Sequence, residues 1–145
     1  MDYGLIGVGA ALAFAAIGSA LGTGSAGMSA IGAWKKAFAQ NRPAPFLLVA
    51  FVGAPLTQTI YGFILMGNLA TAAADGQNGA LLLGAGVLGG IAMMFSAWFQ
   101  GKAGAVASDA LAETGQGFGQ YIMVLGIVET VALFVMVFLL GVVAV

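Results

Sequence analysis

The sequence contains no cysteine and no histidine. Disulfides, thiol nucleophiles and zinc–thiolate clusters are therefore excluded, as are imidazole ligands and an imidazole general base. Charge is scarce as well, because only 6% of the 145 residues are Asp, Glu, Lys or Arg, against about 25% in a typical soluble domain. The net charge of −1 leaves no basic surface for nucleic acid. So few charges cannot cover a water-facing surface, and lipid is therefore the expected solvent.

What the sequence has instead is long apolar runs, separated by short polar breaks. Each run exceeds the roughly 20 residues that a helix needs to cross a bilayer. The N-terminal stretch lacks the Lys or Arg of a signal peptide, so the first run is expected to remain as a span. We predict an all-α membrane protein in which residues 1–145 form a single membrane domain. Its four transmembrane helices are expected at about 4–33, 46–73, 80–111 and 120–145.

The two halves of the chain resemble each other. Pro55–Phe63 aligns with Gly126–Phe134 at an offset of 71 residues, and Leu21–Ala26 aligns with Gln100–Ala105. Each half, about 1–73 and about 80–145, holds two spans, so the halves share one orientation and form two tandem parallel-repeat hairpins. Carriers that work by alternating access through inverted repeats need the opposite arrangement. The repeat therefore argues against such a carrier.

The basic residues are distributed unevenly among the loops. Lys35, Lys36 and Arg42 fall in the first loop, Lys102 lies on the third span's half nearer the third loop, and the second loop has no basic residue. Basic residues favour the cytoplasmic side, so loops one and three are expected there, with both termini extracytoplasmic. Lys102 is expected to extend toward the cytoplasmic surface rather than to pair with Glu129.

Glycine is abundant in the first and third spans. Small residues let helix backbones approach closely in lipid, so these two spans are expected to form an inner layer and the bulkier second and fourth spans an outer one. Residues 22–27 also match the dinucleotide pattern G-x-G-x-x-G, but no strand precedes them, which favours packing over nucleotide binding. The glycines concerned are Gly18, Gly22, Gly27, Gly86, Gly90, Gly101 and Gly104.

Glu129 is the one carboxylate placed deep in a span. It lies roughly 13 Å from the cytoplasmic end of the fourth span at 1.5 Å per residue, near the middle of a core about 30 Å thick. Gln58 and Gln100 lie at a similar depth, Thr57 neighbours Gln58, and Tyr61 follows one helical turn later. Gln and Thr in a membrane often only bond neighbouring helices. An intramembrane carboxylate is functional by default, and the shared depth favours a common site.

The side chains at this depth are hard oxygen ligands. A carboxylate, two amide oxygens, a hydroxyl and a main-chain carbonyl that Pro55 can free suit a hard cation. Because Glu129 supplies the one negative charge, a monovalent ion neutralises the site, whereas a divalent ion would leave it positive in a low dielectric. The residues provide no catalytic group, so the expected role is that of a non-catalytic, ion-binding membrane subunit.

These motifs, taken together, resemble the proteolipid (c or K) subunit of V-type rotary ATPases in its bacterial sodium-transporting form. The resemblance implies that Na⁺ is held by the main-chain carbonyl of Ala54 and by four side chains. It also implies that Tyr61 is hydrogen-bonded to the Glu129 carboxylate. The segments that carry the resemblance are Pro55-Leu56-Thr57-Gln58, Tyr61-Gly62-Phe63, Phe99-Gln100-Gly101-Lys102 and Val128-Glu129-Thr130. The implied side-chain ligands are Thr57, Gln58, Gln100 and Glu129.

The resemblance also implies partners and a location. Identical subunits would form a ring in the bacterial plasma membrane, turned through central-stalk subunits by a soluble ATP-hydrolysing head, beside a stator membrane subunit with two ion half-channels. Gln58 occupies in the first hairpin the place of Glu129 in the second, so one ion per subunit is expected. Two alternatives are a proton-carrying ring and a structural or pore-forming helix ring. The Gln-Thr-Gln set disfavours the first, since a proton needs only the carboxylate, and the buried Glu129 disfavours the second.

Overall fold

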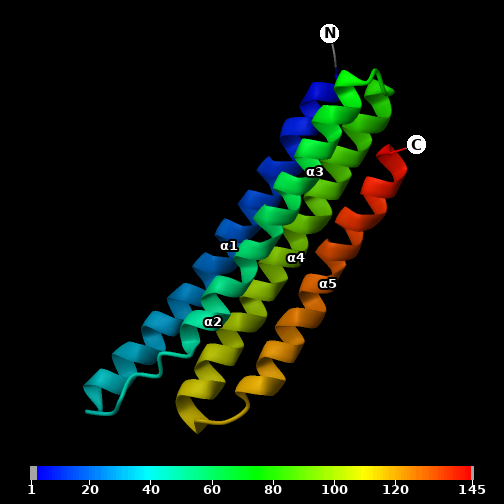
Figure 1. Cartoon of the computed structure of the whole chain (residues 1–145). Helices are drawn as coiled ribbons and strands as arrows, with labels where there is room; N and C mark the ends of the chain where they lie inside the picture. Colours follow the sequence, from blue (N-terminus) through cyan, green and yellow to red (C-terminus); the bar gives the residue numbers. More distant parts are fainter. Residues whose placement is uncertain (1–2, 145) are drawn as a thin grey trace.

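The computed structural model describes residues 3–144, and these residues form helices and no strand (Figure 1). The prediction of an all-α protein is confirmed. Four helical stretches are long and apolar enough to cross a membrane, the second being Leu48–Ala74, which joins three shorter elements. The elements are α1 (Gly4–Ala39), α2 (Leu48–Gly53), the 3₁₀ turn η1 (Ala54–Leu56), α3 (Thr57–Ala74), α4 (Gly79–Thr114) and α5 (Phe118–Val143).

Two helices are longer than the apolar runs from which they were predicted. α1 continues to Ala39 rather than ending near residue 33, so Lys35 and Lys36 lie on its last turns and not in a loop. Polar side chains can continue a helix beyond the apolar layer, and α1 ends just before Asn41, whose φ of 52° is left-handed, two residues before Pro43. α4 continues to Thr114 and ends at Gly115, whose φ of 67° is the left-handed conformation that glycine adopts easily.

The second span changes its helical geometry at Pro55. This residue lacks an N–H and cannot donate to the carbonyl of Phe51 one turn earlier, and the chain passes through the 3₁₀ turn η1 before α3 begins. The Phe51 carbonyl lies against Gly104 of α4, where an added Cβ would come within 2.9 Å of its oxygen. The irregular turn thus packs against a glycine on the neighbouring helix, and it lies directly before Thr57.

α1 and α4 form the closest helix pair, as the glycine pattern predicts. An added Cβ at Gly18 would overlap the backbone of Met94, and one at Gly101 would overlap the backbone of Gly22. The same holds for Gly86 and Gly90 against α1, whereas Gly27 and Gly104 face α2. α5 packs against α3 and α4, on the side of the bundle away from α1 (Figure 1).

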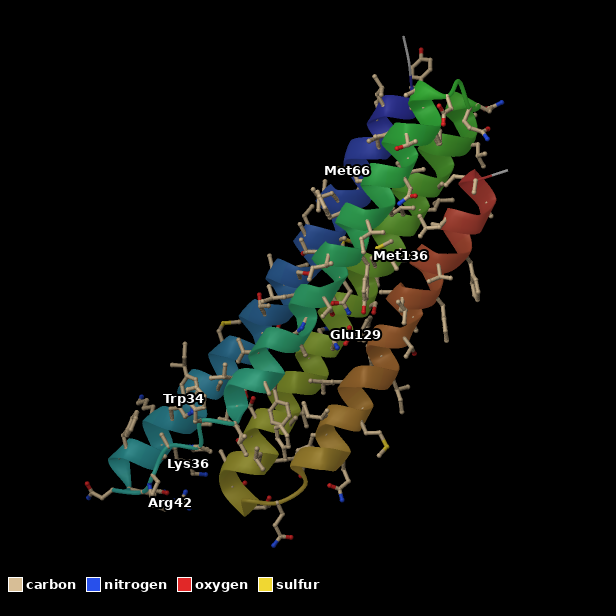
Figure 2. All side chains as sticks on the ribbon, viewed as in Figure 1. Trp34, Lys36, Arg42, Met66, Glu129 and Met136 are labelled. Carbon is tan, nitrogen blue, oxygen red and sulfur yellow. The ribbon has the colours of Figure 1, made fainter. Side chains whose placement is uncertain are left out.

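The two ends of the bundle differ in character. α1 begins and α5 ends at the same end as the short α3–α4 turn (Figure 1). In that turn the Asn78 side chain caps α4. The opposite end carries the long α1–α2 connection and the α4–α5 turn. There the Trp34 indole N–H donates to the Pro45 carbonyl at 2.8 Å, and the exposed Lys36 and Glu113 form an ion pair at 3.1 Å (Figure 2). The cations of the first loop region therefore gather at one end of the bundle.

Candidate ion-binding site

A polar layer separates two apolar clusters in the core of the bundle. One cluster, around Leu65, Met93 and Met136, lies toward the end with the termini, and the other, around Phe51 and Leu125, lies toward the opposite end. Figure 2 shows Glu129 midway along the bundle, on the side where α5 faces α3 and α4. The side chains of the polar layer come from α3, α4 and α5, with a main-chain contribution from η1.

The Glu129 carboxylate receives a hydrogen bond on each of its two oxygens. The Tyr61 hydroxyl of α3 donates to Oε1 at 2.8 Å, and the Gln100 side-chain Nε2 of α4 donates to Oε2 at 3.2 Å. Hydrogen bonds from two neutral donors fix the position and the orientation of the carboxylate. The carboxylate is half-buried, between three helices. Side chains of α3 and α4 therefore hold the Glu129 carboxylate of α5 in place.

The two glutamines are joined directly, and both are completely buried. The Gln58 side-chain Nε2 donates to the Gln100 Oε1 at 2.8 Å. The Gln100 Nε2 also donates to the Leu125 carbonyl of α5 at 3.0 Å, one turn before Glu129. The amides therefore form one hydrogen-bonded chain that runs from Gln58 across α4 to the carboxylate. Buried polar groups are tolerated when they are paired in this way.

Ser96 belongs to the same network, although the sequence pattern did not identify it. Its hydroxyl donates to the Val128 carbonyl at 2.9 Å, so its lone pair is free to accept from the Gln58 Nε2 at 3.3 Å. This contact turns the NH₂ of Gln58 toward α4 and α5 and its Oε1 in the other direction. A signal was present, because Ser96 lies four residues before Gln100 and so on the same helix face.

Three oxygens from the start of α3 lie together on the far side of Gln58. The Thr57 Oγ1 is 3.0 Å from the Ala54 carbonyl and 3.2 Å from the Gln58 Oε1. The Ala54 carbonyl also accepts the Thr57 backbone N–H, so the hydroxyl proton is free to be donated to the Gln58 Oε1. The structure therefore brings all six predicted site residues into one layer. They form a hydrogen-bonded chain, in which the NH₂ groups of Gln58 and Gln100 lie between the oxygens of the other residues.

Chemically, the layer offers oxygen and a single charge. Among the described residues no group of three Asp, Glu, His or Cys side chains could hold a metal ion, so a site built from several carboxylates is not present in that part of the chain. What remains is one carboxylate among neutral oxygens. Such a set can hold a proton or a monovalent cation with a charge balance near zero.

Lys102 does not extend toward the end of α4 as the sequence pattern predicted. Its ammonium lies 4.4 Å from the centroid of the Trp98 ring, one turn back along α4, and 5.2 Å from that of Phe99. It forms no ion pair with Glu129 or with any other residue in the described range. Attraction to the two aromatic faces accounts for this direction, since cations bind ring faces within about 6 Å.

Comparison with known proteins locates a similarity in the second hairpin. Residues 83–141, which cover most of α4 and nearly all of α5, match the family described as the C subunit of ATP synthase. The matched segment contains Ser96, Gln100 and Glu129, whereas the α3 residues of the layer lie outside it. No curated protein matches the chain.

Proposed function

We propose that this chain, whose second hairpin matches the C subunit of ATP synthase, is the ion-carrying rotor-ring subunit of a V-type rotary ATPase and carries one Na⁺ at Glu129. The observation that carries the proposal is the placement of the carboxylate. Glu129 lies midway along a membrane-spanning bundle, half-buried, and receives hydrogen bonds from α3 and α4 on both oxygens. A carboxylate at this depth is costly unless it is neutralised, so it is suited to holding a cation.

The oxygens of the polar layer support Na⁺ as the ion. Ala54, Thr57 and Gln58 offer three neutral oxygens, of which the Thr57 hydroxyl lies within hydrogen-bond distance of the other two. The Gln100 amide oxygen accepts from the Gln58 Nε2, so it becomes a ligand when the ion replaces that hydrogen bond. This oxygen and a carboxylate oxygen of Glu129 then complete a set of hard ligands for a monovalent ion. A proton would need only the carboxylate.

The mechanism follows from the cost of an uncompensated charge. Identical subunits form a ring, and each Glu129 exchanges its ion only where a stator membrane subunit provides an aqueous half-channel. Elsewhere the site faces lipid, where an ion-neutralised carboxylate is tolerated and a bare one is not. ATP hydrolysis in a soluble head turns the ring through a central stalk, so rotation carries each bound ion from one half-channel to the other.

The surfaces around the site fit this assembly. On α3 the side chains of Ile60 and Phe63 are exposed, and on α5 those of Ile127, Val131 and Phe134 are exposed. Apolar side chains at this depth are suited to lipid and to neighbouring helices. Ile127 and Val131 lie about 200° around α5 from Glu129, so α5 presents this apolar face to its surroundings while Glu129 faces α3 and α4.

A carbodiimide labelling experiment tests the ion. A carbodiimide attacks a protonated carboxyl group, so Na⁺ that holds Glu129 ionised should protect it. We expect labelling at neutral pH to fall as sodium rises into the millimolar range, with potassium as the matched control salt. Labelling that follows pH alone and ignores sodium would support the proton-carrying ring and contradict the Na⁺ assignment.

The orientation is proposed from the basic residues. With Lys35, Lys36 and Arg42 on the cytoplasmic side, the α3–α4 turn and both termini are extracytoplasmic, in a bacterial plasma membrane. The chain has no cysteine, so Asn78→Cys introduces a single reactive thiol in that turn. We expect an impermeant maleimide to label it from outside in intact cells, with Asn41→Cys as the cytoplasmic control. Labelling of Asn78→Cys only after the membrane is broken would contradict this orientation and show the opposite one.

A further inference from the structure

An apolar groove lies between α4 and α5, in the half of the bundle toward the α4–α5 turn. It has a volume of about 320 Å³ and is lined by four residues of α4 and three of α5, among them Ala107, Ala110 and Leu125. The side chains of Val106 and Val124, which also line it, are exposed. We name this surface the α4–α5 groove. Because its lining is apolar, its occupant is an apolar group, either a side chain or a lipid chain.

The groove opens on the side of α4 that faces away from α1 of the same subunit. Gly101 marks the side of α4 that packs against α1, at Gly22. Successive residues of a helix are rotated by about 100°, so Ala103 lies about 200° and Ala110 about 180° around the axis from Gly101. The occupant of the groove therefore cannot be α1 of the same chain.

α1 carries two exposed apolar side chains at the level of the groove. Met28 and Ile31 are 70% and 63% exposed. Gly22 packs against Gly101 of α4 and Gly7 packs against Gly86, so residues that are 79 positions apart lie at one level. By this offset Ile31 is level with Ala110, and Met28 is level with Ala107.

Ile31 also points in the direction that a neighbouring copy would occupy. It follows Gly22 by nine residues, and it therefore lies about 180° around α1 from the contact with α4. The subunit thus has an apolar groove on one flank and exposed apolar side chains on the opposite flank, both at one depth. A rotation about an axis along the membrane normal keeps each residue at its depth, so such a rotation can bring the two flanks together in a head-to-tail contact.

We infer that the α4–α5 groove binds Ile31 and Met28 of the next copy of this chain. The internal repeat leads to the same arrangement. The rotation that relates the first hairpin to the second places α4 beside α1. The same rotation, applied once more, places α1 of the next copy beside α4. The alanines of the groove let the helices approach closely, and dispersion contacts with the two side chains replace contacts with lipid. The inference rests on the proposed ring, and it goes further by naming the two surfaces that meet in it.

A disulfide between neighbouring copies tests the contact. The chain has no cysteine, so Ile31→Cys with Ala110→Cys introduces one thiol on each flank. We expect mild oxidation of the assembled ring to give a ladder of covalent oligomers on a denaturing gel. Each single-cysteine variant should give no ladder, because a head-to-tail contact joins residue 31 to residue 110 and not to residue 31 of another copy.

Matched variants separate this contact from random collision. Leu88 is exposed on α4 but lies 22 residues, or about 33 Å, from Ala110, so Ile31→Cys with Leu88→Cys should give no ladder. Ala110→Phe fills the groove and should lower the temperature at which the ring dissociates into subunits. Val137→Phe adds the same ring at an exposed position of α5 outside the groove, and it should leave that temperature unchanged.

The possible failures are distinguishable. An intact ring without the disulfide, or equal ladders with Ala110→Cys and Leu88→Cys, would overturn the inference and leave the groove to lipid. Absence of any ring, seen from the mass of the purified protein before oxidation, would contradict the proposed function itself. Sodium protection of Glu129, measured in the same preparation, reports on the proposed ion independently of the contact between copies.

Discussion

Position 58 in the first hairpin and position 129 in the second occupy equivalent places in the internal repeat, yet their environments differ. Gln58 is completely buried and is held by Gln100 and Ser96. Glu129 is half-buried, where α5 meets α3, and is held by Tyr61 and Gln100. One hairpin therefore places a neutral amide inside the bundle, and the other places a carboxylate near its surface.

The difference shows how one duplicated position can serve two purposes. A neutral amide can be enclosed at little cost when each of its polar atoms has a partner. A carboxylate that exchanges its ion must stay close to a surface, because full enclosure would block the exchange and isolate a charge in a low dielectric. Under the proposed function, Glu129 is therefore the residue expected to exchange the ion, and Gln58 is expected to supply a neutral ligand oxygen.

The largest expected effect comes from removing the charge. Glu129→Gln keeps the size of the side chain, so the ring should still assemble, but ion-coupled ATP turnover should be lost because no negative charge remains in the site. Sodium transport and ATP hydrolysis by the purified complex are the measurements. Glu113→Gln, which removes an exposed carboxylate at the end of α4, is the control. Near-normal sodium transport by Glu129→Gln would contradict the assignment.

Exchanging the two side chains sharpens the comparison. The double variant Gln58→Glu with Glu129→Gln restores the number of charges but encloses the carboxylate beside Ser96. We expect it to stay inactive in sodium transport, because the buried position has no route for exchange. Recovery of transport would show that the two places are equivalent and would remove the distinction drawn between them.

A smaller effect is expected when only a neutral ligand is lost. Gln58→Ala removes an amide oxygen and leaves Glu129 unchanged, so protection from carbodiimide should require more sodium. Losing one such ligand costs on the order of 1–3 kcal/mol, or about 5- to 150-fold in affinity. The labelling of the sodium-free protein serves as the internal control, since the carboxylate is still present. An unchanged sodium requirement would exclude Gln58 from the site.

The smallest effect is expected at Ser96, which acts on the ion through Gln58. Ser96→Ala removes the acceptor that orients the Gln58 amide, at a cost of about 1 kcal/mol, or about fivefold in sodium affinity. Ser108→Ala is a matched control on the same helix, because the Ser108 hydroxyl is also buried but has no hydrogen-bond partner among the described residues. Equal sodium requirements in the two variants would make Ser96 a packing residue.

The four spans were predictable because each apolar run is longer than a bilayer crossing requires, and a helix satisfies its backbone hydrogen bonds within one such run. The residues at which the helices end were not predictable. Lys35 and Lys36 suggested a loop, but polar residues continue a helix until a left-handed residue stops it, as Asn41 does after α1 and Gly115 after α4. The close contact of α1 with α4 followed from glycine, since no other residue would fit at Gly101.

The polar layer was only partly predictable. Gln58, Gln100 and Glu129 could be assigned to one depth, because the rise of a helix is fixed. Ser96 was missed, since a small hydroxyl in an apolar run is ordinary in membrane helices and usually bonds its neighbours. The predicted direction of Lys102 was wrong, although a signal was present, because Trp98 and Phe99 lie four and three residues before it and so on the same helix face.

The sequence by itself determined the chemistry and the depth of the site: one carboxylate, neutral oxygens and a monovalent charge balance, all at one level of four spans. The tertiary structure decided which of these side chains form hydrogen bonds with one another. Tyr61 and Gln100 reach Glu129, and Ser96 reaches Gln58, only because close packing around α4 sets the distances between α3, α4 and α5. The physical reason is that helix periodicity fixes where a residue lies along its own axis, whereas contacts across helices depend on packing, which no single segment encodes.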